Sequence, residues 1–259
     1  MRNNYHTHTN RCLHAYGTDE EYVIRACEGG MTELGFSDHG PFPDKDYGLR
    51  MQYGQLDEYI SSLDRLKEKY KDRLNILKGL EIEYYPAYND YYRALLDEKG
   101  LDYLALGAHS FIDRNGEFKN IFFADDTDTV LDYAKNVCQA IETGFFRFVA
   151  HPDIFFLNDL PVDDNIERAC AMMTDCAAEH DMILEYNANG YRRARRMYHD
   201  GFRYPYPHEM FWRMAAEKNI RVIIGSDCHS PDQVCDESFI FAEKKALQLG
   251  LRLCDSIFE

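Results

Sequence analysis

The chain has 259 residues, of which 45% are hydrophobic and 14% aromatic, so it can bury the core of one large domain. Its 45 acidic and 29 basic residues give a net charge of −16, which makes extended nucleic acid an unfavourable partner. No apolar run approaches the roughly 20 residues that cross a bilayer, and a histidine motif beginning at residue 6 leaves no room for a signal peptide. We therefore expect a cytoplasmic protein with no membrane partner.

Strand and helix patterns alternate along the chain. The first strand is expected at residues 3–8, followed by a helix at 18–30 that opens with a capping box between Thr18 and Glu21. Further strands are expected at residues 33–39, 74–84, 101–110, 146–152, 182–189 and 220–229, and further helices at residues 56–70, 127–144, 164–180 and 208–218. This alternation predicts a parallel α/β sheet, and seven strands favour a barrel, built as a single domain over residues 1–259.

The first strand contains the stretch YHTHT, which places His6 and His8 two residues apart. In an extended strand such residues project to the same side, so two imidazoles can reach one ion. An isolated pair of this kind would more often be the polar edge of a strand. The remaining histidines therefore decide between the two interpretations.

Other potential ligands fall at the C-terminal ends of the expected strands. They are His39, Glu81, His109, His151, Asp227 and His229, with His14 just beyond the first strand. In a parallel barrel these ends meet on one face, where barrel enzymes build their active sites. Structural histidines have no reason to choose the ends of six strands, so the pattern predicts a metal site.

The other histidines and the cysteines are interpreted as structural. His180, His199 and His208 fall at helix ends or in a loop. The eight cysteines contain no C-x-x-C pair, and several lie on apolar helix faces. We expect reduced, buried thiols.

The stretches YHTHT, FSDHG, GLEIEY, GAHS, VAHPD and GSDCHS resemble the polymerase and histidinol phosphatase (PHP) superfamily of metal-dependent phosphoesterases. The resemblance runs from residue 5 to about residue 236. It implies a distorted seven-stranded (β/α)7 TIM-like barrel whose strand ends hold two or three divalent ions, commonly zinc, manganese or iron.

The resemblance also implies which residues bind each ion. The first ion would be held by His6, His8, Glu81 and Asp227, the second by Glu81, His109 and His151, and the third by His14, His39 and His229. A carboxylate has two oxygens and can bridge two ions, so Glu81 is the expected bridge. Glu81, Asp227 and His39 are the residues expected to take part in catalysis.

A basic run, YRRARR, follows the sixth strand in an otherwise acidic chain. A guanidinium fork matches the paired oxygens of a phosphate group, so Arg192, Arg193 and Arg196 are expected to bind substrate. Arg192 is the first choice, because the resemblance aligns it with a basic position after the N-x-x-G turn. The stretch HPDIFFLND offers no basic residue after His151, where one would be expected to hold the substrate.

Four further stretches, SDHGPFP, GLEIEYYP, YNANGYRR and YPYP, resemble the histidinol phosphate phosphatases of the superfamily. This implies hydrolysis of L-histidinol phosphate, in histidine synthesis, by a metal-bridging hydroxide. A nucleotide or another small phosphate ester is the alternative substrate, because ligands alone do not identify it. A non-catalytic metal-binding domain is a third interpretation, and the presence of all nine ligands argues against it.

Overall fold

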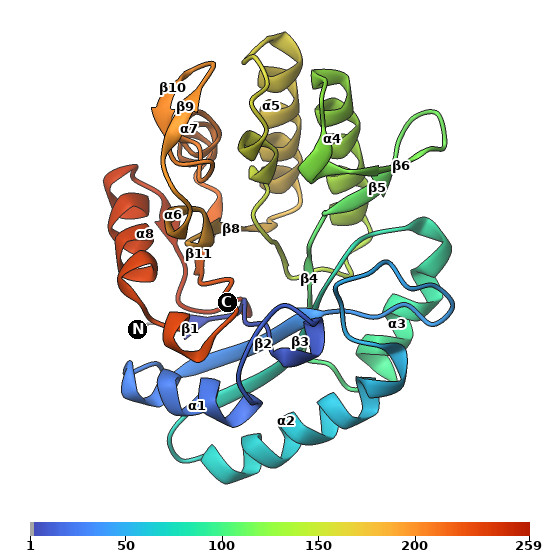
Figure 1. The fold of residues 1–259 in the computed structure, drawn as a ribbon, viewed down its shortest axis with the longest axis vertical. Helices are drawn as coiled ribbons and strands as arrows, with labels where there is room; N and C mark the ends of the chain where they lie inside the picture. Colours follow the sequence, from blue (N-terminus) through green and yellow to red (C-terminus); the bar gives the residue numbers. More distant parts are fainter. Residues whose placement is uncertain (1–2) are drawn as a thin grey trace.

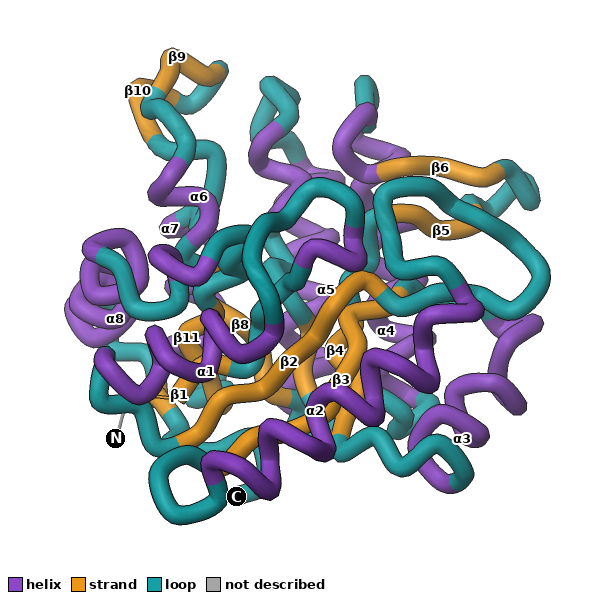
Figure 2. Tube along the Cα trace, turned by 60° about the horizontal axis from the view of Figure 1, so that its bottom comes forward, coloured by secondary structure: helices purple, strands orange, loops and turns teal. Residues whose placement is uncertain are grey.

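The computed structural model describes residues 3–259 and is built around one parallel sheet. The strands lie in the spatial order β1-β2-β3-β4-β7-β8-β11-β12 (Figures 1 and 2). Their bounds are β1 (Asn3–Asn4), β2 (Glu33–His39), β3 (Asn75–Ile82), β4 (Tyr103–Leu106), β7 (Phe148–Val149), β8 (Ile183–Asn187), β11 (Arg221–Gly225) and β12 (Arg252–Leu253). Each of the first seven lies inside one of the seven expected strand segments.

The sheet curls until its first strand meets β11. Thr7, just beyond β1, forms a parallel bridge with Cys228, just beyond β11, and the backbone N–H of His8 donates to the carbonyl of Cys228 at 3.0 Å. The eighth strand, β12, pairs with the start of β11, where Arg252 lies opposite Arg221. The distorted barrel is therefore confirmed, with one more short strand than expected, because the C-terminal segment returns to the sheet.

Helices cover the outer face of the sheet (Figure 2). Five of them match the expected segments: α1 (Asp19–Glu28), α2 (Leu56–Tyr70), α4 (Thr127–Glu142), α5 (Asp164–Glu179) and α7 (Glu209–Glu217). The capping box of α1 is confirmed, because the Glu21 carboxylate accepts the backbone N–H of Thr18 at 2.6 Å. Within residues 3–259, no helix has both the length and the hydropathy that crossing a membrane requires.

Three helices and two hairpins were not expected from the sequence. The helices are α3 (Asn89–Asp97), α6 (Asn189–Arg192) and α8 (Glu237–Gln248). The antiparallel hairpins join β5 (Ser110–Ile112) to β6 (Phe118–Asn120) and β9 (Arg196–Tyr198) to β10 (Gly201–Arg203). Both hairpins lie in loops that follow sheet strands, and in Figure 2 they stand on the same side of the molecule.

The lower half of the barrel interior is apolar. It is filled by Tyr5, Leu77, Tyr103, Ala105, Phe148, Ala150, Ile183, Ile223 and Ile257. The fully buried Tyr103 hydroxyl donates to the carbonyl of Tyr5 at 2.8 Å, and Gly79 leaves the space that its ring occupies. This layer forms a floor, so the next inward-facing side chains on each strand meet at the C-terminal end of the barrel.

Candidate metal centre

Strand register places the expected ligands on that inward face. On β3, Leu77 belongs to the apolar floor and Glu81, four residues later, points to the same side. Ile223 of β11 belongs to the same floor, and Asp227 follows two residues after that strand ends. His39 ends β2 directly opposite Glu81 in the β2–β3 pairing. The parallel register thus brings ligands from distant parts of the chain to one level.

Glu81 is at the centre of the cluster, and its two oxygens face different histidines. Oε1 lies 2.9 Å from Nε2 of His151 and 3.3 Å from Nε2 of His109. Oε2 lies 3.3 Å from Nε2 of His6, 3.5 Å from Nε2 of His8 and 3.0 Å from Nδ1 of His39. The carboxylate therefore stands between the histidines that the resemblance assigns to the first and second ions, with His39 of the third set also facing Oε2.

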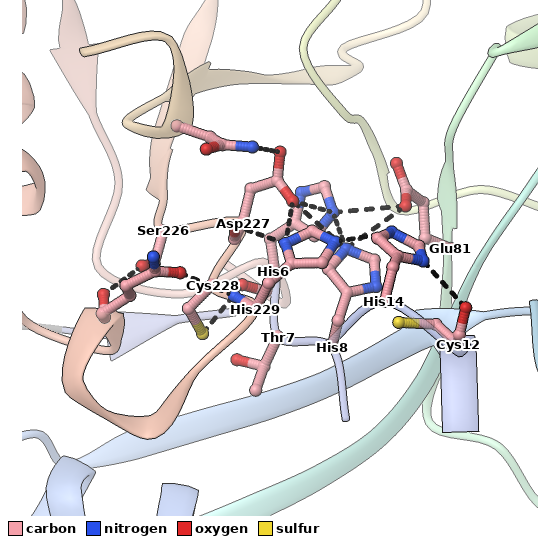
Figure 3. A network of polar contacts seen from close by, with 12 residues as sticks. His6, Thr7, His8, Cys12, His14, Glu81, Ser226, Asp227, Cys228 and His229 are labelled. Atoms are coloured by element: carbon pink, nitrogen blue, oxygen red, sulfur yellow. Dashed lines mark hydrogen bonds and ion pairs between the residues drawn. The ribbon is translucent and has the colours of Figure 1, made fainter. Parts of the chain in front are cut away.

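Asp227 and two further histidines extend the cluster toward solvent. Asp227 Oδ1 lies 3.2 Å from Nε2 of His8 and 3.5 Å from Nδ1 of His229. The facing Nε2 atoms of His14 and His229 are 3.0 Å apart. Ligand atoms of His14, His39 and His229 all lie within 4.8 Å of one another, as the third expected ion site requires. Figure 3 shows His8, His14, Asp227 and His229 converging, with the Cys228 sulfur directed away.

The nine side chains fit divalent metal ions. Among the described residues, Glu81 Oε2 is a buried oxygen with no hydrogen-bond partner, although three imidazoles face it. Two nitrogens bound about 2.0–2.1 Å from one tetrahedral ion lie about 3.3 Å apart, close to the spacings of the facing imidazoles. Seven imidazoles and two carboxylates suit zinc, manganese or iron better than calcium or magnesium.

The electrostatics of the cluster keep its carboxylates ionised. Burial acts to raise the pKa of Glu81, but the facing imidazoles of His109 and His6 hold that pKa well below its usual range. Burial opposes ionisation of Asp227 in the same way, and His6 and His8 hold its pKa well below the usual range. Burial lowers the pKa of His229 to about 3, so this imidazole is neutral and able to coordinate.

Two carboxylates that sequence reasoning missed contact the expected ligands. Glu185 Oε1 lies 2.7 Å from Nδ1 of His6. Glu83 Oε1 lies 3.3 Å from Nδ1 of His109, and Arg50 donates to both Glu83 oxygens at 2.9 and 3.0 Å. Such partners fix the ring orientation and the free nitrogen of a ligating histidine. The spacing in the sequence could have identified Glu185, because it lies two residues after Ile183 of the apolar floor and so shares the inward face of β8.

Two glycines make room for the inward carboxylates. A Cβ atom at Gly107 would lie 2.5 Å from Glu81 Oε1, and a Cβ at Gly225 would lie 1.6 Å from Glu185 Oε1. Two ligands also adopt left-handed backbone conformations, His151 with φ of 30° and Asp227 with φ of 49°. Such conformations are costly outside glycine and persist where the surrounding structure holds them.

The cluster forms the floor of a pocket of about 290 Å³. Its walls add Phe122, Ile154, Asn189, Arg193, Tyr206 and Gln233. Among residues 3–259, Arg193 is the one arginine or lysine side chain that lines this pocket. Asn189 donates to Asp227 Oδ2 at 3.0 Å, and the ring of Phe122 stacks parallel to His109. The pocket thus combines a ligand-rich floor, one permanent positive charge and apolar walls.

The other arginines of the basic run lie elsewhere. Arg192 Nε donates to Asp236 at 2.7 Å and Nη2 to Ser226 Oγ at 2.9 Å, so its guanidinium ties α6 to the start of α8. Arg196 donates to the carbonyl of Leu157, and Arg195 to the carbonyl of Phe202. The structure therefore does not bring Arg192, the first choice from sequence, or Arg196 into the pocket. The stretch after His151 contributes Ile154 and no basic residue, as the sequence indicated.

The three histidines interpreted as structural lie outside the cluster. His180 caps the end of α5 through the carbonyl of Cys176, His199 bonds Asp159, and His208 bonds Asp200 while stacking on Phe156. The eight cysteines, all within residues 3–259, form no disulfide. Burial raises the pKa of Cys12, which lies near His8 and His229, to about 12.

Residues 4–189 match the family model described as the PHP domain. This range is well over half of the chain. The chain belongs to the PHP domain family. Seven of the nine expected ligands lie inside the matched range, and Asp227 and His229 lie beyond it yet join the same cluster in space.

Several known proteins resemble this chain over most of its length. A "Probable histidinol-phosphatase" of Deinococcus radiodurans is 31% identical, with 92% of this chain and 89% of the relative covered. A "Histidinol-phosphatase" of Bacillus subtilis is 25% identical, with 88% and 94% covered. A solved histidinol phosphate phosphatase from Lactococcus lactis, complexed with zinc, L-histidinol and phosphate, superposes with a TM-score of 0.67 at 15% identity, covering 97% of this chain and 95% of that chain. The last comparison supports the fold.

Proposed function

We propose that this PHP domain is a metal-dependent phosphomonoesterase that hydrolyses L-histidinol phosphate to L-histidinol and phosphate. The observation that carries the proposal is a single small pocket lined by seven of the nine metal-type ligands and by the guanidinium of Arg193, with His6 and His8 buried in the same cluster. The names of the relatives from Deinococcus radiodurans and Bacillus subtilis support the same substrate.

The residues divide the work as follows. Divalent ions held by the nine ligands would supply an activated water and neutralise phosphoryl oxygens. Arg193 faces the same pocket, and its fork is suited to two oxygens of the transferred phosphoryl group. Glu81 and Asp227 remain ionised and hold the ligand set together, and His39 pairs with Glu81 at 3.0 Å. The chain itself needs no nucleophile.

The pocket also limits the kind of substrate. A volume of about 290 Å³ suits a small ester, and Phe122, Ile154 and Tyr206 offer apolar surface for its organic part. The net charge of −16 opposes a polynucleotide, which would bring many phosphates at once. A monoester with one phosphate can place its charge on the pocket floor.

The test is a turnover assay on protein of measured metal content, with L-histidinol phosphate, a nucleoside monophosphate and 4-nitrophenyl phosphate in parallel. We expect kcat/KM for L-histidinol phosphate to exceed that of the other two by about 100-fold or more, the discrimination that a pocket with matched polar contacts can give. Equal or higher kcat/KM for the nucleotide would overturn the substrate and leave the phosphatase assignment. No turnover of any ester by metal-loaded protein would overturn both.

A further inference from the structure

A second and larger pocket lies outside the barrel. Its volume is about 750 Å³, and it is enclosed by α6, α7, α8 and the β9–β10 hairpin. In Figure 1 these elements adjoin at the orange and red end of the chain. The pocket shares no lining residue with the metal pocket, so no step of the proposed reaction uses it. We refer to it as the outer pocket.

Aromatic rings form one wall of the outer pocket. The ring of Tyr191 meets Tyr204 edge to face at 5.0 Å and meets Phe241 edge to face at 4.9 Å. Tyr186, behind Tyr191, is 2% exposed and packs against Trp212. This arrangement presents a rigid apolar surface on which a planar ring can pack.

This wall also carries a hydrogen-bond donor. The hydroxyls of Tyr186 and Tyr191 lie 2.6 Å apart. The pair has two hydroxyl protons and one mutual hydrogen bond, so one proton is left for another acceptor. Burial raises the pKa of Tyr191 to about 12, and burial raises that of Tyr186 as well, so both protons are present at neutral pH.

The charges around the outer pocket leave an excess of cations. Asp200 pairs with Arg203 at 2.8 Å, and the imidazole of His208 contacts the same carboxylate at 2.7 Å. The carboxylate of Glu209 pairs with Arg213 on the same helix. Within residues 3–259, Arg195 and Lys245 have no carboxylate partner: Arg195 donates to a backbone carbonyl, and Lys245 lies over the Phe241 ring at 5.5 Å. Two unbalanced cations are notable in a chain of net charge −16.

We propose that the outer pocket binds a small aromatic carboxylate. The ring would pack against Tyr204 and Phe241, and the carboxylate would accept from the free tyrosine proton and pair with Lys245 and Arg195. Each favourable group on the wall has a counterpart in such a ligand. A neutral aromatic compound would leave both cations unpaired, and an aliphatic anion would leave the rings exposed. The proposal is independent of the reaction at the metal pocket.

The experiment uses the full chain, loaded with metal, and indole-3-acetate as probe, with indole-3-acetamide as its neutral counterpart. Binding is measured by ligand-observed NMR and calorimetry in the wild type, Lys245→Gln, Arg195→Gln and the control Lys244→Gln, an exposed lysine next to Lys245 on α8. We expect saturable one-to-one binding of the acid, at least fivefold weaker binding of the amide, and at least a fivefold rise in Kd for Lys245→Gln and Arg195→Gln. The control should match the wild type.

A competition separates the two pockets. Inorganic phosphate, which the metal pocket is suited to bind, should leave the Kd of indole-3-acetate unchanged. Displacement of the probe by phosphate would place it at the metal centre and overturn the proposal. Absence of saturable binding, or a Kd that neither Lys245→Gln nor Arg195→Gln alters, would overturn it as well.

Discussion

The Glu185 carboxylate lies 2.7 Å from Nδ1 of His6, and both side chains are fully buried. Because Nδ1 faces Glu185, it is Nε2 that His6 turns toward Glu81 and Asp227. Glu185 is itself held by the backbone N–H of His151 at 3.0 Å and by Asn187 at 2.9 Å. A side chain that touches none of the proposed ions thus connects two of their ligands.

Substituting this carboxylate should weaken metal binding without unfolding the chain. Glu185→Gln keeps the shape but removes the charge that makes the His6 imidazole a stronger donor, so we expect metal affinity to fall about 10- to 100-fold. Competition with a chromogenic chelator measures it. The control Glu167→Gln, at an exposed position on α5, should bind metal as the wild type does. Wild-type affinity in Glu185→Gln would show that Glu185 does not orient His6 for metal.

The two sides of Glu81 predict a difference in metal stoichiometry. Glu81→Gln leaves one oxygen and replaces the other with a poor ligand, so this variant should lose close to two ions after dialysis at limiting free metal. His109→Ala removes a ligand from one side, so it should lose closer to one ion. Both variants should lose most phosphatase activity. Elemental analysis gives the counts, and full metal content with near-normal turnover in Glu81→Gln would contradict the bridge.

The strands and the ligand positions could be predicted from the sequence because both are local signals. Short apolar runs bounded by helices specify buried parallel strands, and the rare residues His, Asp and Glu stand at their ends. Parallel topology then brings those ends together without any knowledge of contacts. The helix α3 was missed because it has only nine residues and begins after Tyr88, whose side chain forms no capping hydrogen bond.

The orienting and substrate-facing residues depended on information that the sequence does not display. The partner of Glu185 is His6, 179 positions earlier in the chain, so the pair exists only after the barrel closes. Arg192 and Arg193 are adjacent, and the four-residue helix α6 decides which one faces the pocket. A shift of one position on a helix turns a side chain by about 100°, which sequence patterns do not resolve at a helix end.

Substitutions of these two adjacent arginines should have different effects, one on turnover and the other on stability. Arg193→Ala should lower kcat/KM for L-histidinol phosphate about 10- to 1,000-fold, because it removes a charge-assisted contact to the phosphoryl group. Metal content and the urea midpoint should stay unchanged. Arg192→Ala should instead destabilise the fold by about 2 kcal/mol, since it removes the charge-assisted hydrogen bonds that Asp236 and Ser226 accept from the guanidinium. Urea unfolding and steady-state kinetics distinguish the two, and reversed phenotypes would return the phosphate contact to Arg192.

Removing metal should destabilise the fold. The cluster buries two ionised carboxylates among imidazoles. A metal ion that binds the folded state, at a free concentration of about 100 times its Kd, would add about 2.7 kcal/mol to the free energy of unfolding. Dialysis against a chelator should therefore lower Tm by about 5–10 °C. Zinc or manganese should restore it and magnesium should not, because imidazole ligands disfavour magnesium. His199→Ala, outside the cluster, should respond like the wild type, whereas a Tm insensitive to chelation would contradict metal binding by the folded chain.

A substitution at Gly107 tests the space around Glu81 without replacing any of the expected ligands. A methyl group there would lie 2.5 Å from both the Cγ and Oε1 atoms of Glu81, closer than any ordinary contact, so the carboxylate must shift. Because Glu81 faces five histidines, a displacement of even a few tenths of an ångström should misplace it for both proposed ions. We expect Gly107→Ala to lower metal affinity and turnover by at least about 10-fold.

The matched control is Gly54→Ala, where a Cβ meets nothing within 4 Å and which should behave as the wild type. Circular dichroism and urea unfolding show whether Gly107→Ala is folded. A folded Gly107→Ala variant with wild-type metal affinity would mean that the Glu81 carboxylate can move without cost, and that its position between the two histidine sets is not what holds the metal.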